Sequence, residues 1–382
     1  MNYFFTEEEQ MIIDTCNEIG RKYILPKRDF YHKTKEVPRD IIEEFRKADL
    51  FKLFVPEKYN GMGTKHMHLL LAVETLSTYC GSIPLWLAAT ALATTPLVLF
   101  GNEEQKEKYL KKVAAGSIAS FALTEPDAGS DFMAMKTVAK KEGNNYRISG
   151  TKHFITNAGE AEFYIVFVKT RPDKGARGIS AFIVDSNAPG FELVGLEDKV
   201  GIRSSNTGTI AFNEVLVPKE ALLGEENKGM RIINDTFLQS RIGIGAQGIG
   251  IAQGIFNEAL KYLTQRKQFG QPITSFQVPQ DKLFRAATQI ERSRALMYAI
   301  ARSADAGNIP KKEAIMSKVE ASEMSIEVCR DMVQIVGGIG LMNDAPFVKY
   351  LVDSLVTSQY EGHNGVLTLA GFQQILKEFK EK

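Results

Sequence analysis

The residue in this chain with the clearest chemical potential is a carboxylate near the C-terminus. Glu361 lies in the segment Ser358–Gly362, of sequence SQYEG, which we expect to form a loop that opens into a final helix. Burial against apolar walls raises the pKa of a carboxyl group toward neutrality, which suits a general base. A lone glutamate beside a glycine is also typical of a solvated cap, so the surrounding motifs must decide between the two interpretations.

Four upstream segments combine glycines, hydroxyl groups, aromatic rings and charged side chains. Leu123–Asp131 is a glycine-containing loop, and its exposed N–H groups can donate hydrogen bonds. Phe154–Asn157 offers a hydroxyl and an aromatic ring at an expected strand end. Arg266–Gly270 offers a guanidinium fork that suits phosphate oxygens, and Gln334–Gly338 follows a long helix. Taken singly, the first three are ordinary features: a Pro-Asp turn, a strand threonine and a basic helix end.

Together and in this order, the segments resemble the acyl-CoA dehydrogenase family, and the resemblance covers essentially the whole chain. It implies an FAD-dependent enzyme with Glu361 as the catalytic base. The residues it implies for FAD binding are Phe121, Leu123, Thr124, Ser130, Phe154, Thr156, Arg266, Gln268, Phe269, Gln277, Gln334, Gly338 and His363. The residues it implies for substrate binding are Ser130, Arg241, Tyr360 and Gly362.

The resemblance also implies an assembly of several copies. Arg266 would contact the FAD pyrophosphate, with Gln268 and Phe269 against the adenine end. In relatives this motif and the Gln334–Gly338 segment reach across a subunit interface, which implies a homo-oligomer, most simply a dimer of dimers. The flavin site would then require at least two chains.

The implied reaction is α,β-dehydrogenation of an acyl-CoA thioester. Glu361 would remove the α proton while the β hydride passes to flavin N5, and an electron-transfer flavoprotein would accept the electrons. Hydrogen bonds from the Glu361 N–H and a ribityl hydroxyl would stabilise the developing enolate. An acyl-CoA oxidase, or a dehydrogenase of branched or cyclic acyl groups, is the first alternative. A flavin-free acyl-CoA-binding protein is the second.

Three positions depart from the family pattern. Leu238 stands where relatives usually carry an aspartate, three residues before Arg241. Ser240 stands where a minority of relatives carry the catalytic carboxylate, so the base cannot lie there. His363 replaces the usual threonine after Glu361-Gly362, where it would hydrogen-bond FAD, alter substrate selection or simply lie at the surface.

One glycine-rich segment resembles a dinucleotide-binding motif but is not expected to bind a nucleotide. Residues 243–248, of sequence GIGAQG, match the dinucleotide fingerprint G-x-G-x-x-G, but that site needs a strand before the glycines. Here the glycines lie within an expected helix, where they predict close packing between helices. The pair His66 and His68 has no third ligand within sequence reach, so no metal site is expected.

Three zones of the sequence should position these residues. Residues 1–117 read as helical, with a capping box at Thr6 and Glu9. Residues 118–228 contain short β-branched and aromatic runs, which predict a small antiparallel β-barrel or sandwich. Residues 229–382 contain long helical segments with short breaks, which predict a four-helix bundle. The expected fold class is α+β, as the resemblance also implies. The clearest expected strands cover residues 146–148, 163–168, 179–184 and 209–212, and the long helices cover 230–266, 280–306 and 311–336.

Composition sets limits on partners and compartment. The net charge of +1 gives no global electrostatic case for nucleic acid or an anionic membrane. The three cysteines are far apart and fit a reducing compartment. No signal or transit peptide is visible. We expect a bacterial cytoplasmic protein, or a mitochondrial matrix protein whose presequence has been removed.

Substrate choice is less determined. The apolar stretch 83–100 predicts a buried helix rather than a membrane span, and its counterpart in relatives lines the acyl pocket. It carries Trp86, several alanines and no charge, which argues against a dicarboxylyl substrate. Chain length and Glu361 resemble the short-chain branch, while the small residues also suit a branched or cyclic acyl group.

Overall fold

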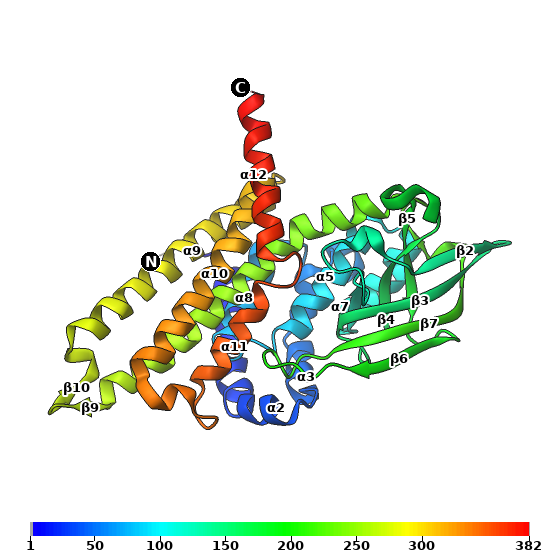
Figure 1. The fold of residues 1–382 in the computed structure, drawn as a ribbon. Helices are drawn as coiled ribbons and strands as arrows, with labels where there is room; N and C mark the ends of the chain where they lie inside the picture. Colours follow the sequence, from blue (N-terminus) through cyan, green and yellow to red (C-terminus); the bar gives the residue numbers. More distant parts are fainter. Residues whose placement is uncertain (1–2, 382) are drawn as a thin grey trace.

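The computed structural model describes residues 3–381, which form a helical region, a β-sheet and a second helical region in sequence order. The sheet lies at one end of the molecule, and the N-terminal helices lie between it and the C-terminal helices (Figure 1). The first region contains α1 (Glu7–Ile19), α2 (Arg28–Thr34), α3 (Arg39–Lys47), α4 (His66–Ser77), α5 (Leu85–Phe100), α6 (Glu103–Gln105) and α7 (Lys111–Ala114). The sheet contains β1 (Ala119–Ala122), β2 (Val138–Glu142), β3 (Asn145–Thr156), β4 (Phe163–Lys169), β5 (Ile179–Asp185), β6 (Phe191–Leu196), β7 (Thr207–Pro218) and β8 (Leu222–Leu223). The last region contains α8 (Gly229–Gln265), the hairpin β9 (Lys267–Gln268) and β10 (Gln271–Pro272), α9 (Gln277–Asp305), α10 (Lys311–Val336), α11 (Phe347–Thr357) and α12 (Asn364–Lys380). This order confirms the expected α+β class.

The N-terminal helices begin and end where local chemistry directs them. Thr6 and Glu9 form the expected capping box at the start of α1. Helix α5 is buried along most of its length, as its apolar composition predicts, and Trp86 is fully buried within it. Among residues 3–381, no helix combines the length and apolar character needed to cross a membrane.

The sheet is mixed rather than purely antiparallel. Its strands follow the order β6-β7-β3-β2-β4-β5-β8, and β1 pairs with β4 beside that path. Most neighbours are antiparallel, but β1 and β2 both run parallel to β4. Sequence patterns did not reveal β1, β2 or β6, because β1 has only 4 residues and β2 and β6 face largely outward. Strand periodicity shows most clearly when one face is buried and the other is solvated.

The long helix α8 joins the sheet to the bundle (Figure 1). Two of the three glycines in residues 243–248, Gly245 and Gly248, permit the expected close packing, because they lie against neighbouring helices with no room for a side chain. A Cβ at Gly245 would lie 1.9 Å from Met297, and one at Gly248 would lie 2.9 Å from the Ala321 carbonyl oxygen. These glycines lie inside α8 and not in a turn between a strand and a helix, so the match to the dinucleotide fingerprint is fortuitous.

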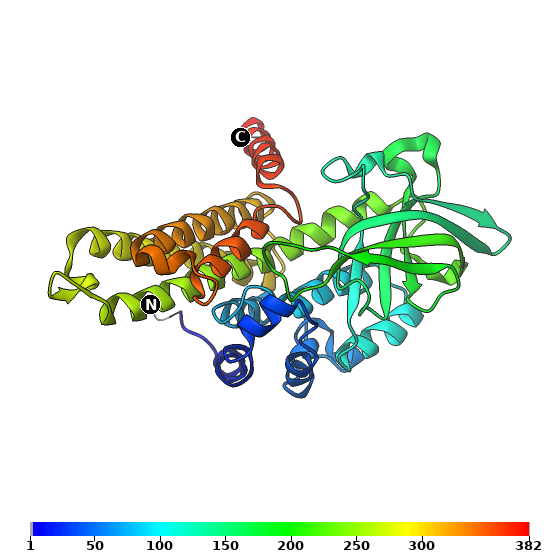
Figure 2. The same cartoon turned by 60° about the horizontal axis from the view of Figure 1, so that its bottom comes forward.

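The bundle contains α8, α9, α10 and α11, which pack against one another. Helix α9 begins at Gln277 rather than at residue 280, and Pro279 lies in its first turn, where a missing N–H costs nothing. Helix α12 packs against α10 at its start and projects away from the bundle in both views (Figures 1 and 2). Its outer turns expose Leu369, Phe372 and Phe379.

Candidate active site

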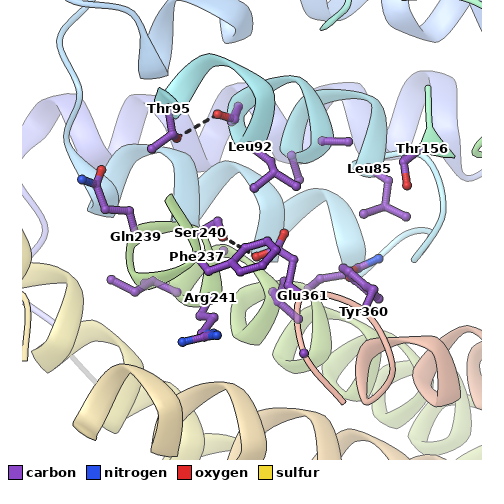
Figure 3. A pocket seen from close by; sticks show the side chains of 18 of the residues that line it. Leu85, Leu92, Thr95, Thr156, Phe237, Gln239, Ser240, Arg241, Tyr360 and Glu361 are labelled. Carbon is purple, nitrogen blue, oxygen red and sulfur yellow. Dashed lines mark hydrogen bonds between the residues drawn. The ribbon is translucent and has the colours of Figure 1, made fainter. Parts of the chain in front are cut away.

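A cavity of about 1040 Å³ lies where α5, α8 and the loop before α12 meet the sheet (Figure 3). Helix α5 contributes apolar walls through Leu85, Ala88, Ala89, Ala91 and Leu92. The structure places these sequence-predicted residues on the cavity walls: Leu123, Thr124, Ser130, Phe154, Thr156, Arg241, Tyr360, Glu361, Gly362 and His363. They come from the loop after β1, from β3, from α8 and from the α11–α12 loop. The fold therefore brings together segments that are far apart in the sequence.

Glu361 lies on a strained part of that loop. Its φ angle is +52°, and that of Gly362 is +105°, so two successive residues adopt a conformation that L side chains rarely take. His363 caps α12, since its Nδ1 accepts a hydrogen bond from the Gly365 N–H. Strain of this kind persists only where surrounding contacts hold the backbone in place, and it is common at functional sites.

The carboxylate of Glu361 is surrounded by one hydroxyl and two cationic groups. The Ser240 hydroxyl donates a hydrogen bond to Oε2 of Glu361. Burial raises the pKa of Glu361 to about 7, although the Ser240 hydrogen bond and the charges of Arg241 and Lys318 each lower it. A carboxyl group with this pKa can accept a proton and release it again near neutral pH.

Lys318 on α10 holds the same loop through hydrogen bonds. It is fully buried in α10, and its Nζ donates to the Gly362 carbonyl oxygen at 2.9 Å and to Asn364 Oδ1 at 2.7 Å. Asn364 in turn donates to Ser322 at 2.9 Å and to Glu323 at 2.6 Å. Burial lowers the pKa of Lys318 to about 8, opposed by the nearby charge of Glu361. This network fixes the backbone on both sides of His363.

Arg241 is half-buried beside the base, with part of its hydrogen-bonding capacity unused. Its Nε atom is buried and has no hydrogen-bond partner among the described residues, and its guanidinium lies 5.7 Å from the Phe237 ring centroid. Burial lowers its pKa, while Glu361 opposes that change. A buried, unpaired donor facing a cavity suits an oxygen atom of a ligand.

Tyr360 links the loop to two other elements. Its hydroxyl donates to Gln247 Oε1, and Gln247 Nε2 donates to the Gly81 carbonyl oxygen at 2.7 Å. Burial raises the pKa of Tyr360 well above its ordinary value. The phenol therefore stays neutral and donates to Gln247, fixing the side chain next to the base.

The sheet side of the cavity is anchored by another buried lysine. Lys152 Nζ donates to the Leu123 carbonyl oxygen at 2.9 Å and to Glu125 Oε1 at 2.8 Å. Glu125 also accepts from the backbone N–H of Lys136 and of Thr137. These bonds hold the loop that presents Thr124 to the cavity.

The sheet side also has the chemistry that a flavin requires. Hydroxyl groups of Thr124, Ser130 and Thr156 line the cavity together with the ring of Phe154. Phe154 is 59 % exposed and has a φ angle of +56°, so its ring is available to a flat ligand. Hydroxyl donors beside an aromatic face fit the edge and face of an isoalloxazine ring.

Other predicted residues lie outside this cavity. Phe121 packs between Phe167 and Phe237, with ring centroids 4.8 Å and 5.6 Å away. A second group is exposed at the far end of the bundle: Arg266, Gln268, Phe269, Gln277, Gln334 and Gly338. Phe269 is 94 % exposed. Within one chain, the β9–β10 hairpin lies far from the sheet (Figure 1), so the structure does not bring these residues to the cavity.

One expectation about the cavity walls needs correction. Trp86 does not line the cavity, because its indole points away and donates to the Ser204 carbonyl oxygen at 2.9 Å.

The two histidines near the start of α4 do not belong to a larger cluster of possible metal ligands. His66 Nδ1 lies 3.1 Å from Asp305 Oδ1. Residues 3–381 contain no group of three or more histidine, cysteine or carboxylate side chains able to hold a metal.

Sequence patterns mark Ser240 only as a position without a carboxylate, and they do not point to Gln247, which lines the cavity with it. They also do not point to Lys318 and Asn364, which hold the Glu361 loop from outside the cavity. Lys318 was detectable in principle, since a lysine on the apolar face of a helix needs a buried partner. Ser240 carried no such signal, because a serine in a helix is unremarkable until its neighbour is known.

Comparison with known proteins gives consistent results over the whole chain. Family models for the N-terminal, middle and C-terminal domains of acyl-CoA dehydrogenase match residues 6–117, 120–215 and 227–376. An acyl-CoA dehydrogenase of Bacillus subtilis (strain 168) is 40 % identical over 366 residues, covering 95 % of this chain and 97 % of that protein.

Two solved structures have the same fold. Butyryl-CoA dehydrogenase from Megasphaera elsdenii superposes with a TM-score of 0.96 at 35 % identity, covering 98 % of this chain and 100 % of that one. A chain from work on the electron transferring flavoprotein of Acidaminococcus fermentans and flavin-based electron bifurcation has a TM-score of 0.96 at 39 % identity, with the same coverage.

Proposed function

Because this chain belongs to the acyl-CoA dehydrogenase family of flavin-dependent oxidoreductases, we propose that it catalyses FAD-dependent α,β-dehydrogenation of an acyl-CoA thioester. The observation that carries the proposal is the Glu361 carboxylate, which lines the cavity and has a pKa near 7. FAD, when bound, supplies the hydride acceptor at its N5 atom. The substrate loses a proton from the α carbon and a hydride from the β carbon, leaving a double bond between them.

This chain's own residues would bind, orient and deprotonate the substrate. Glu361 takes the α proton on its carboxylate, and its backbone N–H donates to the thioester carbonyl where enolate charge develops. Arg241 offers the unpaired Nε donor on the same wall. The apolar side chains Leu85, Leu92 and Ile244 exclude water from the acyl group.

Residues from two regions would hold FAD. Thr124, Ser130, Thr156 and Phe154 would contact the flavin half inside the cavity. Arg266, Gln268, Phe269, Gln277, Gln334 and Gly338 would hold the pyrophosphate and adenine half from a second copy of the chain. Their position at the far end of the bundle supports this arrangement, since one chain cannot deliver both groups to one cofactor. We therefore propose a homo-oligomer, with a dimer of dimers as its simplest form; a homotetramer is typical of the family.

The proposed electron acceptor is an electron-transfer flavoprotein. Similarity to the Acidaminococcus fermentans chain supports this partner. The proposed substrate is a short-chain acyl-CoA, which similarity to butyryl-CoA dehydrogenase supports.

The decisive experiment is an anaerobic titration of the purified protein with linear, branched, cyclic and aryl-substituted acyl-CoAs, monitored through the visible flavin spectrum. We expect a short linear acyl-CoA to bleach the flavin. Bleaching by a branched or cyclic member alone would show that the substrate is a branched or cyclic acyl-CoA. Bleaching followed by rapid reoxidation in air would favour an oxidase. A colourless protein would contradict the proposal.

The role of Glu361 is tested by Glu361→Gln. We expect the rate of flavin bleaching to fall by about 10²- to 10⁴-fold, the usual contribution of general base catalysis. FAD content and the circular dichroism spectrum serve as controls, because glutamine has nearly the same shape as glutamate. A variant that retains FAD and reacts at the wild-type rate would remove Glu361 from the mechanism.

A further inference from the structure

Ser240 and Glu361 come together from a helix and a loop that are far apart in the sequence. Ser240 lies on α8, a helix of 37 residues whose glycines pack against its neighbours. Glu361 lies on the loop between α11 and α12 with a left-handed φ angle of +52°. Figure 3 shows the hydrogen bond between them at the centre of the cavity. The hydroxyl is thus presented by a closely packed helix, from which it can set the orientation of the carboxylate side chain.

The other groups that face the carboxylate act differently. Arg241 on α8 and Lys318 on α10 lower the pKa of Glu361 through their charges. Tyr360 on the same loop directs its hydroxyl to Gln247, away from the base. Glu323 on α10 accepts from Asn364, and His363 on the same loop accepts from the Gly365 N–H through its Nδ1. Among the described residues, Ser240 thus supplies the hydrogen bond that reaches the carboxylate itself.

A serine hydroxyl has one proton to donate, and an ionised carboxylate only accepts. The bond is therefore strongest when Glu361 is ionised, because hydrogen bonds to charged groups are shorter and stronger than neutral ones. It also fixes which oxygen of the carboxylate is occupied. Oε2 is engaged by Ser240, which leaves Oε1 as the oxygen free to receive a proton.

We propose that Ser240 is a positioning residue for the base, and that its hydroxyl holds the Glu361 carboxylate with Oε1 toward the substrate and stabilises its ionised form. The inference rests on the proposed function, in which Glu361 removes the α proton. It assigns a role to a position that the sequence pattern marks only by the absence of a carboxylate.

The first test is the pH profile of kcat/KM for Ser240→Ala. We expect the wild-type profile to rise with pH through about 7, the pKa of Glu361. In S240A the rise should move up by about one pH unit, so that activity falls about tenfold at pH values below both midpoints. At alkaline pH Glu361 is fully ionised in both proteins, so a lower kcat/KM of S240A on that plateau would report a less favourable orientation of the carboxylate.

Two further variants separate this role from general loss of packing. Ser240→Thr keeps the hydroxyl and should restore the wild-type midpoint. Thr236→Ala removes a buried hydroxyl one turn earlier on α8 that has no hydrogen-bond partner among the described residues, and it should leave the profile unchanged. An S240A profile that superimposes on the wild type, or an equal shift in T236A, would overturn the inference.

A second test does not depend on turnover. The free energy of unfolding is measured from pH 4 to pH 9 for the wild type, E361Q, S240A and the double variant. The stability difference between E361Q and its parent should grow with pH from about 4.5, the pKa of Glu361 in the unfolded chain, and level off at the pKa of Glu361 in the folded chain. The pH at which the difference levels off should be about one unit higher in the S240A background. Should no acyl-CoA bleach the flavin, the proposed function fails, while this measurement still decides whether Ser240 stabilises the ionised carboxylate. Identical pH dependence in both backgrounds would contradict the inference.

Discussion

At the scale of the residue, the site depends on opposing effects on one carboxyl group. Burial disfavours the ionised form of Glu361, and Ser240, Arg241 and Lys318 favour it. Burial prevails, since the pKa remains raised to about 7 from an ordinary value of 4.5. Two nearby cations are not enough to restore the ordinary value, because the site shields the group from water. The balance yields a base that is about half ionised at neutral pH.

The raised pKa of Glu361 predicts that its ionisation destabilises the folded state. Between pH 4.5 and 7 the unfolded chain ionises Glu361 while the folded chain keeps it protonated, so the folded state loses relative stability as pH rises. Above pH 7 the loss is complete and amounts to at most about 3 kcal/mol. We therefore expect Glu361→Gln to be more stable than the wild type at pH 8, and no more stable at pH 4, in urea denaturation. A gain independent of pH would show that the effect does not come from ionisation.

At the scale of the element, α8 performs two tasks on different faces. One face carries Ser240 and Arg241 into the cavity. Another face carries glycines that let α4 and α10 approach closely, so that Gly250 lies against the Glu74 carbonyl oxygen of α4. The close packing gives Ser240 a fixed position, and this is why a glycine-rich stretch is found in a helix that supports a site.

Gly250→Ala tests the packing of α8. A Cβ at this position would lie 2.3 Å from the Glu74 carbonyl oxygen and 2.5 Å from Ser77 Cβ, so the helices must separate. We expect a loss of about 1–3 kcal/mol in the free energy of unfolding, typical of overpacking. Gly243→Ala on the same helix is the matched control: it meets nothing within 4 Å and should gain up to about 1 kcal/mol from helix propensity. Equal effects of the two variants would contradict the packing argument.

The strained loop shows how a second element completes the site. Glu361 and Gly362 both have positive φ angles, and the buried ammonium of Lys318 binds the carbonyl oxygen of Gly362. Helix α10 therefore supplies the contacts that stabilise an otherwise unfavourable backbone conformation. The loop alone has no reason to adopt this conformation.

At the scale of the whole molecule, the predicted flavin residues fall into two groups. One group lines the cavity, and the other is exposed at the end of the bundle near the β9–β10 hairpin (Figure 1). This separation is expected if the cofactor lies between two chains, since each chain then contributes one group to each of two sites. Exposed apolar side chains such as Phe269 are also consistent with a surface covered in an assembly.

Arg266→Ala tests the shared site. We expect FAD to bind roughly 10- to 100-fold more weakly, because a charge-assisted hydrogen bond to the pyrophosphate is lost. Flavin retained after gel filtration at a series of protein concentrations measures the effect, and light scattering reports the oligomeric state. Lys267→Ala is the matched control, since it removes a neighbouring exposed charge outside the predicted set. Undiminished FAD retention in R266A would contradict the two-chain site.

The sequence by itself determined the class of protein and most of its elements. Capping residues and apolar periodicity are local, so the capping box at Thr6 and Glu9, the buried helix α5 and the long helices α8 and α10 could be predicted. The candidate base could be predicted as well, because the motif around Glu361 lies in consecutive residues. Elements without periodicity, such as β1, could not be predicted, since a strand of 4 residues is too short to show an alternating pattern.

Only the tertiary structure decided what surrounds the base. Ser240 and Glu361 are separated by 121 residues, and Lys318 and Gly362 by 44, so neither hydrogen bond has a trace in local sequence. The direction of Trp86 away from the cavity, and the division of the flavin residues into two groups, are likewise results of how helices and sheet pack. Residue types establish which chemistry is available, while burial and distance, which set the pKa of Glu361, exist only once remote segments are brought together.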